Sequence, residues 1–339
     1  MILNRILPTK FLLRHFTSIT PSGIPVIDLA PFYKGTDSDR LKVAKHMDEV
    51  CRDIGFFTVI NHGVDKTIMD SAWGATRNFF DLPLEHKNVV ETVKDYPFGY
   101  SGFKGETLSR GLGNQKQLPD LKEMMCIGPV HQVPGIPSNL WPKEHLVIKD
   151  AWEAYYKQMS NLSSNILEIF ALALNKPQNW FTDKIDYHGS ALRALNYPHQ
   201  DSPPKPGELR ASAHTDYGSM TILKQDDSPG GLQVMHRSGE WVNVGYTGDS
   251  FVVNLGDLMQ KWTNERWVST LHRVVNPPVQ DVSSTRRQSM AFFHNINPDH
   301  LVTVIDTCTS LECPPKFEPI TAGDHLMQKH NAAMGHAPL

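Results

Sequence analysis

Short apolar runs separated by turn signals fill the region from residue 190 to residue 296. The turn signals are clusters of Gly, Pro, Ser and Asp at 228–231, 238–239, 248–249 and 256–257. Many short strands at even spacing are typical of β-sandwiches and barrels. The pattern therefore predicts a double-stranded β-helix, or jelly roll, with room for a ligand between its two sheets.

The first half of the chain mixes helical and strand patterns. Apolar residues recur at helical spacing over 38–53, and a longer apolar stripe over 143–174 predicts a helix that braces the sheet. The remaining expectations there are strands at 26–29 and 56–61, a helix at 65–80 and a Gly-rich loop at 96–118. The fold class is therefore α+β, with a jelly-roll core and an N-terminal helical region packed outside it.

Residues 211–219 contain His214 and Asp216, two positions apart. Side chains at i and i+2 of a strand point to one face, so this pair could bind one ion together. His272 lies in another alternating run and could supply a third ligand. Two His and one carboxylate, with three positions left open, suit non-haem Fe(II) oxygen chemistry. The chain has 16 His, so this motif needs support from other residues.

Arg287 and Ser289 have the same strand spacing further along the chain. A guanidinium beside a hydroxyl on one face makes a clamp for a carboxylate, which accepts two parallel hydrogen bonds. Tyr197, in a Tyr-Pro pair at an expected strand end, could complete the clamp.

With these residues the chain resembles the iron- and 2-oxoglutarate-dependent oxygenases of the isopenicillin N synthase-like superfamily. That family shows His-x-Asp, a distal His and Arg-x-Ser, with Tyr-Pro before the first ligand. Fourteen residues lie between His272 and Arg287, more than in many members, which predicts a longer hairpin loop. Arg286 is a neighbouring alternative, but only Arg287 has Ser two positions later. Further family-like segments are 24–29, 55–64, 230–234, 254–257, 262–264 and 269–274, so the resemblance extends from about 24 to about 330.

The resemblance implies that His214, Asp216 and His272 hold Fe(II) and act as the catalytic centre. It also implies that 2-oxoglutarate chelates the iron and that its far carboxylate pairs with Arg287, Ser289 and Tyr197. The expected reaction uses O2 to hydroxylate or desaturate a small molecule, or to close a ring, and releases succinate and CO2. Ascorbate is an expected reductant.

The substrate pocket is less defined by the sequence. Phe293 shares a face with Ser289 if the strand continues, which places it near the iron or the substrate or in the core, whereas Phe292 should point away. Trp262 is a second pocket candidate. Lys104, Arg110 and Lys261 are further candidates for substrate contact.

Two other functions remain open from the residues alone. One is an iron oxidase on the same scaffold that works without 2-oxoglutarate, in which Arg287 and Ser289 would hold the substrate's own carboxylate. The other is a non-catalytic jelly-roll binding protein, against which the intact set of three ligands argues.

The charge balance argues against nucleic acid as a partner. Lys and Arg number 33 against 36 Asp and Glu, a formal charge of −3, without the basic excess that phosphate backbones attract. No apolar run approaches the length of a membrane span. The four Cys include no Cys-x-x-Cys pair, so free thiols are expected. We therefore expect a small-molecule partner, no nucleic acid, no membrane, and a monomer or weak homo-oligomer.

Residues 1–23 carry Arg and Lys but no acidic residue, with apolar residues interleaved. Such a composition resembles a mitochondrial transit peptide, and an ordinary disordered extension fits equally well. The expected location is cytoplasmic, with mitochondrial import as the alternative. The expected regions are this extension (1–23), an N-terminal dioxygenase region with bracing helices (24–180), the jelly-roll core (181–305) and a C-terminal extension and helix (306–339).

Overall fold

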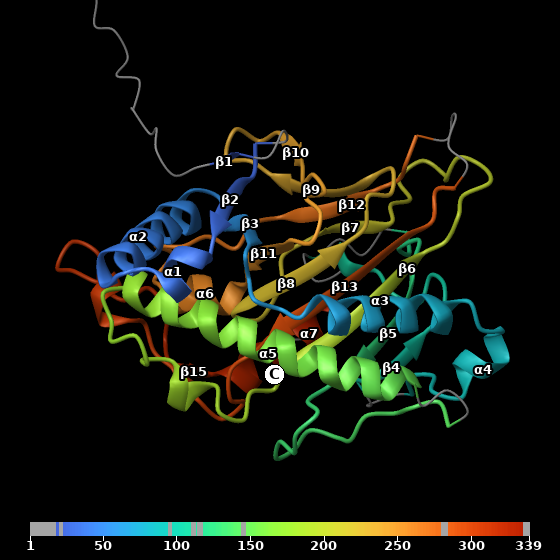
Figure 1. Cartoon of the computed structure of the whole chain (residues 1–339), viewed down its shortest axis with the longest axis horizontal. Helices are drawn as coiled ribbons and strands as arrows, with labels where there is room; N and C mark the ends of the chain where they lie inside the picture. The colour runs from blue at the N-terminus through green and yellow to red at the C-terminus, as the bar shows by residue number, and fades with distance from the viewer. Residues whose placement is uncertain are drawn as a thin grey trace, which may run out of the picture.

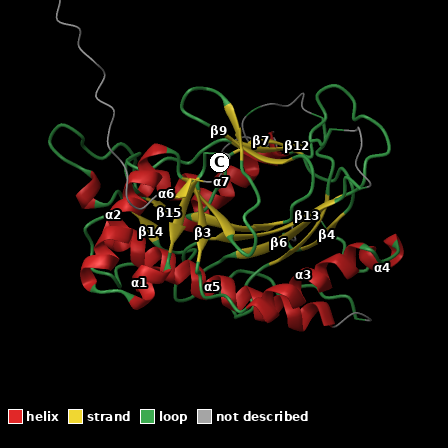
Figure 2. Cartoon of the chain, turned by 45° about the horizontal axis from the view of Figure 1, so that its top comes forward, coloured by secondary structure: helices red, strands yellow, loops and turns green. Residues whose placement is uncertain are grey.

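The computed structural model describes residues 18–19, 23–93, 97–109, 113, 118–143, 147–278 and 284–334. Two sheets face each other in these residues, and helices cover the outer side of the larger one (Figure 1, Figure 2). Figure 2 shows the smaller sheet, with β7, β9 and β12, on the side opposite α3 and α5. This is the jelly-roll core expected from the strand pattern.

The large sheet has nine strands in the order β1-β2-β3-β11-β8-β13-β6-β5-β4. Four strands of the core, β11, β8, β13 and β6, lie side by side in this order, and strands from the N-terminal region flank them on both sides, so residues 24–180 and 181–305 share one sheet. Its strands are β1 (Ser18–Ile19), β2 (Pro25–Asp28), β3 (Phe56–Ile60), β4 (Gly99–Ser101), β5 (Glu123–Ile127), β6 (Ala191–Tyr197), β8 (Met220–Gln225), β11 (Phe251–Leu255) and β13 (Arg287–His294).

The small sheet has four strands in the order β10-β9-β12-β7. They are β7 (Ala211–His214), β9 (Gly231–Met235), β10 (Trp241–Asn243) and β12 (His272–Val275). A separate pair, β14 (Leu301–Val302) and β15 (Ile320–Thr321), precedes the last helix.

The helices agree closely with the sequence patterns. α2 begins in a capping box between Thr36 and Asp39, and Asp65 caps α3 by accepting hydrogen bonds from two backbone amides. The expected bracing helix is α5, whose apolar stripe is buried against the sheet and the neighbouring helices. The helices are α1 (Ala30–Lys34), α2 (Asp37–Asp53), α3 (Lys66–Phe80), α4 (Leu84–Asn88), α5 (Val147–Ala173), α6 (Asp257–Trp262) and α7 (Ala322–Met334), with 3-10 turns at Thr182–Lys184 and Asp306–Cys308.

One expectation for this region was wrong. The stretch 96–118 was expected to be loop only, but it contains β4, which pairs with β5 at the edge of the large sheet. Gly99 has φ of 122°, and the Val90 carbonyl lies where it would clash with a Cβ, so this position requires glycine. Gly99 therefore marks a strand start, whereas Gly102 and Gly105 lie in loop as expected.

Side chains of β13 alternate between two environments. Phe292 packs edge-on against Tyr156 of α5, and Met290 contacts the Thr76 hydroxyl of α3, so the even-numbered side chains face the helices. The odd-numbered residues therefore face the small sheet: they are Arg287, Ser289, Ala291 and Phe293.

The register extends this inner face to the neighbouring strands. On β6, Tyr197 lies opposite Arg287 and Arg193 lies opposite Ala291. On β8, Gln225 lies opposite Ser289. Because directly opposed residues share a face, these polar side chains line the space between the two sheets.

No helix in the described ranges is long and apolar enough to cross a bilayer. Most of the extension at 1–23 lies outside the described residues, but Ser18 and Ile19 pair antiparallel with the start of β2. The extension thus reaches the edge of the large sheet.

Candidate active site

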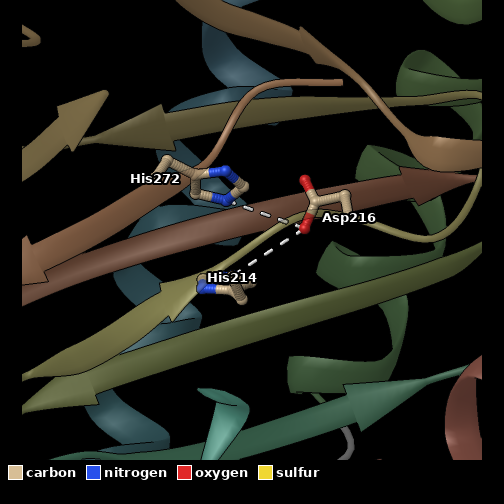
Figure 3. Close-up of side chains that lie close together, drawn as sticks. All are labelled: His214, Asp216 and His272. Atoms are coloured by element: carbon tan, nitrogen blue, oxygen red, sulfur yellow. Dashed lines mark ion pairs between the residues drawn. The ribbon is translucent and has the colours of Figure 1, made fainter. Parts of the chain in front are cut away.

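His214, Asp216 and His272 come together between the two sheets, as Figure 3 shows. One ligand atom from each residue lies within 4.8 Å of the other two. The nearer Asp216 oxygen, Oδ1, is 3.7 Å from His272 Nε2 and 3.9 Å from His214 Nε2. His214 and His272 are directly opposed on β7 and β12, so strand pairing brings the two imidazoles together.

Backbone contacts select which ring nitrogen of each His is free. Nδ1 of His214 is 2.8 Å from the Ser212 carbonyl, and Nδ1 of His272 is 3.0 Å from the Thr270 carbonyl. Each Nδ1 must carry a proton to donate to a carbonyl, which leaves Nε2 with the lone pair that a metal requires.

Asp216 is held in the same way through its other oxygen. Oδ2 accepts hydrogen bonds of 2.6 Å from Thr221 and from Asn254, so Oδ1 stays free toward the two imidazoles. His214 and Asp216 were expected to lie on one strand, and this expectation is wrong in detail. β7 ends at His214, and Asp216 lies in the following turn, where these contacts orient it instead of strand alternation.

The electrostatics favour the protonation states that a cation needs. Burial and the neighbouring His272 lower the pKa of His214. Burial alone would raise the pKa of Asp216, but the two imidazoles and the two hydrogen bonds outweigh it and lower the pKa. The site therefore holds a neutral His214 and an ionised Asp216, as metal binding requires. Two imidazoles and one carboxylate fit Fe(II).

Arg287 lies further along the inner face and is 1% exposed. It donates to Gln225 Oε1 at 3.0 Å and to Ser289 Oγ at 3.3 Å, and its guanidinium carbon lies 5.0 Å from the centre of the Tyr197 ring. No carboxylate in the described part of the chain forms an ion pair with it. A buried guanidinium without a counter-ion is costly, so this site fits an anionic ligand such as a carboxylate.

A cavity of about 390 Å³ opens beside Arg287. Gln225, Gly231 and Leu232 share its wall, but the metal-ligating candidates do not. Gly231 has φ of 136°, which residues with a Cβ rarely adopt, and a Cβ there would make only an ordinary contact with Arg287 Nε at 3.9 Å, so the backbone conformation explains this glycine. The Gly-Gly motif was visible in the sequence, but its position over Arg287 was not.

Sequence reasoning did not assign Thr221, Asn254 or Gln225, the side chains that hold Asp216 and Arg287. Asn254 belongs to a segment that resembled the family, which was the one available signal. Arg210 was also missed: it is fully buried, lies 5.8 Å from the Tyr197 ring centre and donates to the carbonyls of Pro229 and Thr285.

The pocket candidates divide into two groups. Phe293 shares the inner face with Ser289 and is partly exposed there, while Phe292 points to the helices. Trp262 is not brought to the site: it is buried in α6 against Trp180 and Phe181, because its large apolar surface completes the core.

Two of the three charged candidates for substrate contact have partners of their own. Lys104 pairs with Glu208 at 2.7 Å. Lys261 is on α6, and its Nζ lies 5.7 Å from the centre of the Phe317 ring. Arg110 lies outside the described residues.

Comparison with known proteins agrees with this geometry. Residues 24–144 match the family "non-haem dioxygenase in morphine synthesis N-terminal", and residues 189–296 match the "2OG-Fe(II) oxygenase superfamily". The chain is 33% identical to homoarginine-6-hydroxylase 2-ODD-233 of Oryza sativa subsp. japonica, with 91% of this chain and 96% of the relative covered. It is 31% identical to the 2-oxoglutarate-Fe(II) type oxidoreductase hxnY of Emericella nidulans, over 94% and 93%.

A solved structure is similar over the whole fold. This full-length Neurospora crassa protein, in complex with alpha-KG and thymine, superposes with a TM-score of 0.83 at 30% identity, over 94% of this chain and 100% of that one. Sequence and structure agree that the enzyme uses Fe(II), 2-oxoglutarate and O2, and acts as an oxidoreductase. The chain therefore belongs to the 2-oxoglutarate- and Fe(II)-dependent oxygenase superfamily.

Proposed function

We propose that His214, Asp216 and His272 hold the Fe(II) of this enzyme. The observation that carries the proposal is the convergence of their three free ligand atoms, each oriented by a contact to its other polar atom. Such contacts fix ring orientation and tautomer in metal sites. Together these residues would hold one Fe(II) ion, which would supply the oxygen chemistry there.

Arg287, Ser289 and Tyr197 are proposed to bind the far carboxylate of 2-oxoglutarate. Arg287 is buried without a counter-ion, and both other side chains lie within its reach on the inner face. When bound, iron and 2-oxoglutarate supply the oxidising chemistry, in which decarboxylation to succinate and CO2 accompanies oxidation of a C–H bond. The protein's own residues position both partners and exclude water.

The reaction proposed is hydroxylation of a small molecule, with desaturation as the second outcome on the same site. The relatives support a small-molecule substrate: one is a homoarginine-6-hydroxylase, and the Neurospora crassa structure contains thymine. These two molecules differ in charge and shape, so the relatives do not select between substrate classes.

Two further features belong to the proposal. We infer a monomer or weak homo-oligomer that binds neither nucleic acid nor membranes; the formal charge of −3 supports the inference about nucleic acid. The location is cytoplasmic or, if residues 1–23 act as a transit peptide, mitochondrial. Light scattering checks the first, and imaging of a tagged protein checks the second.

Single Ala variants of His214, Asp216 and His272 test the metal assignment. Each should abolish succinate formation and weaken Fe(II) binding in calorimetry, while the circular dichroism spectrum stays unchanged because the core does not include the ion. His236→Ala, at an exposed turn between β9 and β10, is the matched control and should behave as the unmodified enzyme. Full activity in any of the three variants would remove that residue from the site.

A further inference from the structure

Four charged side chains, two buried and two partly exposed, form a cluster beside the metal site. Glu106 pairs with Arg193 through Oε1 at 3.0 Å and with Lys122 through Oε2 at 2.8 Å. Lys122 also lies 3.4 Å from Asp120. Nothing in the metal site or the 2-oxoglutarate clamp uses these residues.

Hydrogen bonds tie this cluster to the strand that carries His214. Asp120 accepts from the Ser212 amide at 2.9 Å and from the Leu108 amide at 3.1 Å. The Ser109 amide donates to Ser212 Oγ at 3.1 Å. Ser212 is two residues before His214 on β7, so the segment that carries Glu106 lies directly beside the metal site.

Arg193 faces the same interior space as the clamp. It shares the inner face of β6 with Tyr197, and four residues of strand separate the two by about 13 Å. Its guanidinium carbon lies 5.4 Å from the ring centre of Phe293 on β13. The clamp therefore occupies one end of the inner face and Arg193 with Phe293 the other, with the small residue Ala291 between them.

Tyr217 lies next to the metal site. It follows Asp216 in the turn, where its carbonyl accepts hydrogen bonds from the start of α6 and from α7, and its side chain is partly exposed. Glu106 and Arg193 therefore lie beside the Phe293 ring, and Tyr217 adjoins the metal ligand Asp216. We call these four residues the polar–aromatic subsite.

The charges of the cluster are already balanced. Burial alone would raise the pKa of Glu106, but Lys122 and Arg193 lower it to about 2, so the carboxylate is ionised at neutral pH. Two carboxylates then face two cations. A cationic substrate would have to displace Arg193 or Lys122 from Glu106, and an anionic one would have to displace Glu106 from Arg193, each leaving a buried charge without its partner.

The exposure of the four side chains shows which two of them a substrate can contact. Lys122 and Asp120 are 2% and 1% exposed at their side chains, whereas Glu106 and Arg193 are each about a quarter exposed. Glu106 offers an acceptor and Arg193 offers donors, side by side. A neutral molecule with an adjacent donor and acceptor can bind both without breaking the ion pair, and partly exposed rings favour a planar one.

We propose that the polar–aromatic subsite binds the substrate, and that the substrate is an uncharged, planar ring of the cyclic amide or imide class. The ring donates to Glu106, accepts from Arg193 and packs on Tyr217 and Phe293. This assignment deepens the proposed function and depends on it.

Calorimetry on the anaerobic enzyme loaded with Fe(II) and 2-oxoglutarate tests the proposal without turnover. The probes are three neutral rings, thymine, uracil and 2-pyridone, together with L-homoarginine as a cation and phenylacetate as an anion. At least one neutral ring should bind more tightly than either charged probe. Arg193→Gln and Glu106→Gln should each weaken that binding about tenfold or more, because a hydrogen bond to a charged group is lost.

Two controls separate this proposal from loss of folding and from failure of the metal site. Glu123→Gln alters a second buried carboxylate with a Lys partner, Lys87 at 2.8 Å, on the helix-facing side of β5, and should leave ring binding unchanged. Arg193→Lys keeps the ion pair and should still weaken ring binding, because Lys lacks the planar two-donor edge. Fe(II) and 2-oxoglutarate titrations of each variant should match the unmodified enzyme.

The outcomes are decisive in either direction. Tighter binding of homoarginine or phenylacetate, or binding of none of the neutral rings, overturns the substrate class. Ring binding within twofold of the unmodified enzyme in Arg193→Gln and Arg193→Lys overturns the subsite. If the unmodified enzyme instead fails to bind Fe(II) or 2-oxoglutarate, the proposed function fails, which is a separate result.

Discussion

At the scale of single residues, each side chain of the site is oriented by hydrogen bonds to the polar atom that does not bind the ligand. His214 and His272 have free Nε2 atoms because their Nδ1 atoms face backbone carbonyls, and Asp216 has a free Oδ1 because Oδ2 is engaged by two donors. Arg287 follows the same logic: Gln225 and Ser289 orient the guanidinium and leave its positive charge for a ligand.

Replacing Arg287 by Gln tests the 2-oxoglutarate clamp. The change leaves the ligand's far carboxylate without its charged partner in a buried site, a loss of about 2–5 kcal/mol. The affinity for 2-oxoglutarate should therefore fall about 30-fold or more, and Fe(II) affinity should hardly change. Titration of 2-oxoglutarate into the anaerobic Fe(II) enzyme, followed by its keto-acid charge-transfer absorption, gives the first affinity, and calorimetric titration of Fe(II) into the metal-free enzyme gives the second.

The adjacent residue supplies the control. Arg286 bonds to Asn196 and Asp81 on the helix-facing side, so Arg286→Gln should leave the 2-oxoglutarate titration unchanged. Arg287→Lys should recover only part of the loss, because a point charge lacks the two-donor fork. Equal affinities in the unmodified and Arg287→Gln enzymes would move the clamp elsewhere.

His188 should make the protein sensitive to acid. It is stacked on Tyr156, and burial first, then the nearby His131, lower its pKa to about 4. Between about pH 6.5 and 4, His188 is therefore protonated in the unfolded chain but neutral in the folded chain. Its effect on the free energy of unfolding is absent above this range, and the protein loses stability as the pH falls through it. The slope from this residue is about 1.4 kcal/mol per pH unit.

Urea unfolding at pH 7, 6 and 5 measures that slope. His188→Phe keeps an aromatic ring on Tyr156 but cannot take up a proton, so its free energy of unfolding should decline less steeply toward pH 5. The exposed His236→Gln variant should keep the original slope. A His188→Phe variant with undiminished pH dependence would assign the effect to other groups.

At the scale of elements, α6 positions the turn that carries Asp216. The Asp257 and Leu258 amides at the start of α6 donate to the carbonyls of Asp216 and Tyr217. α7 adds a contact from the other side, between His325 Nε2 and the Tyr217 carbonyl at 3.0 Å. The turn is therefore held by two helices and not by strand pairing.

Gly256, just before α6, makes this approach possible. A Cβ at this position would lie 2.2 Å from the Gly218 carbonyl oxygen, so Gly256→Ala must push the Asp216 turn away. We expect a loss of about 1–3 kcal/mol in stability and weaker Fe(II) binding, measured by urea unfolding and calorimetry.

Gly74, in the middle of α3, is the matched control. No atom outside its immediate surroundings lies within 4 Å of a Cβ there, so Gly74→Ala should stabilise the protein by about 0.5–1 kcal/mol and leave Fe(II) binding unchanged. Unchanged Fe(II) binding in Gly256→Ala would show that the turn adapts without moving Asp216.

At the scale of the whole molecule, the catalytic space lies between two sheets assembled from distant parts of the chain. β2 and β3 from the start of the chain extend the large sheet beyond β11, and β4 and β5 extend it beyond β6. α3 and α5 cover the outer face of this sheet, opposite the small sheet (Figure 2), so the polar inner face of β6, β8 and β13 remains available for ligands.

Deleting residues 1–17, which stops short of β1, tests the role of the extension. The segment is basic and free of acidic residues, and the family match begins only at residue 24. Activity and thermal stability should remain nearly unchanged, while a tagged protein should change its location in a eukaryotic cell. Identical distributions of the full-length and shortened proteins would contradict a transit peptide.

The sequence by itself determined the features that depend on local spacing. Strand alternation placed Arg287, Ser289 and Phe293 on one face, and Tyr197 at a strand end, as the structure has them. The sequence patterns located α2, α3 and α5 to within a few residues, because helical periodicity acts over one or two turns.

Only the tertiary structure decided which distant residues meet. Asp216 lies in a turn whose orientation comes from Asn254 and the start of α6, and Glu106 reaches the metal site through a segment tied to β7. Nothing in the sequence around Trp262 distinguishes a residue of the pocket wall from a residue of the core. These arrangements depend on sheet register and long-range packing. Both are determined jointly by residues far apart in the sequence, so no local pattern predicts them.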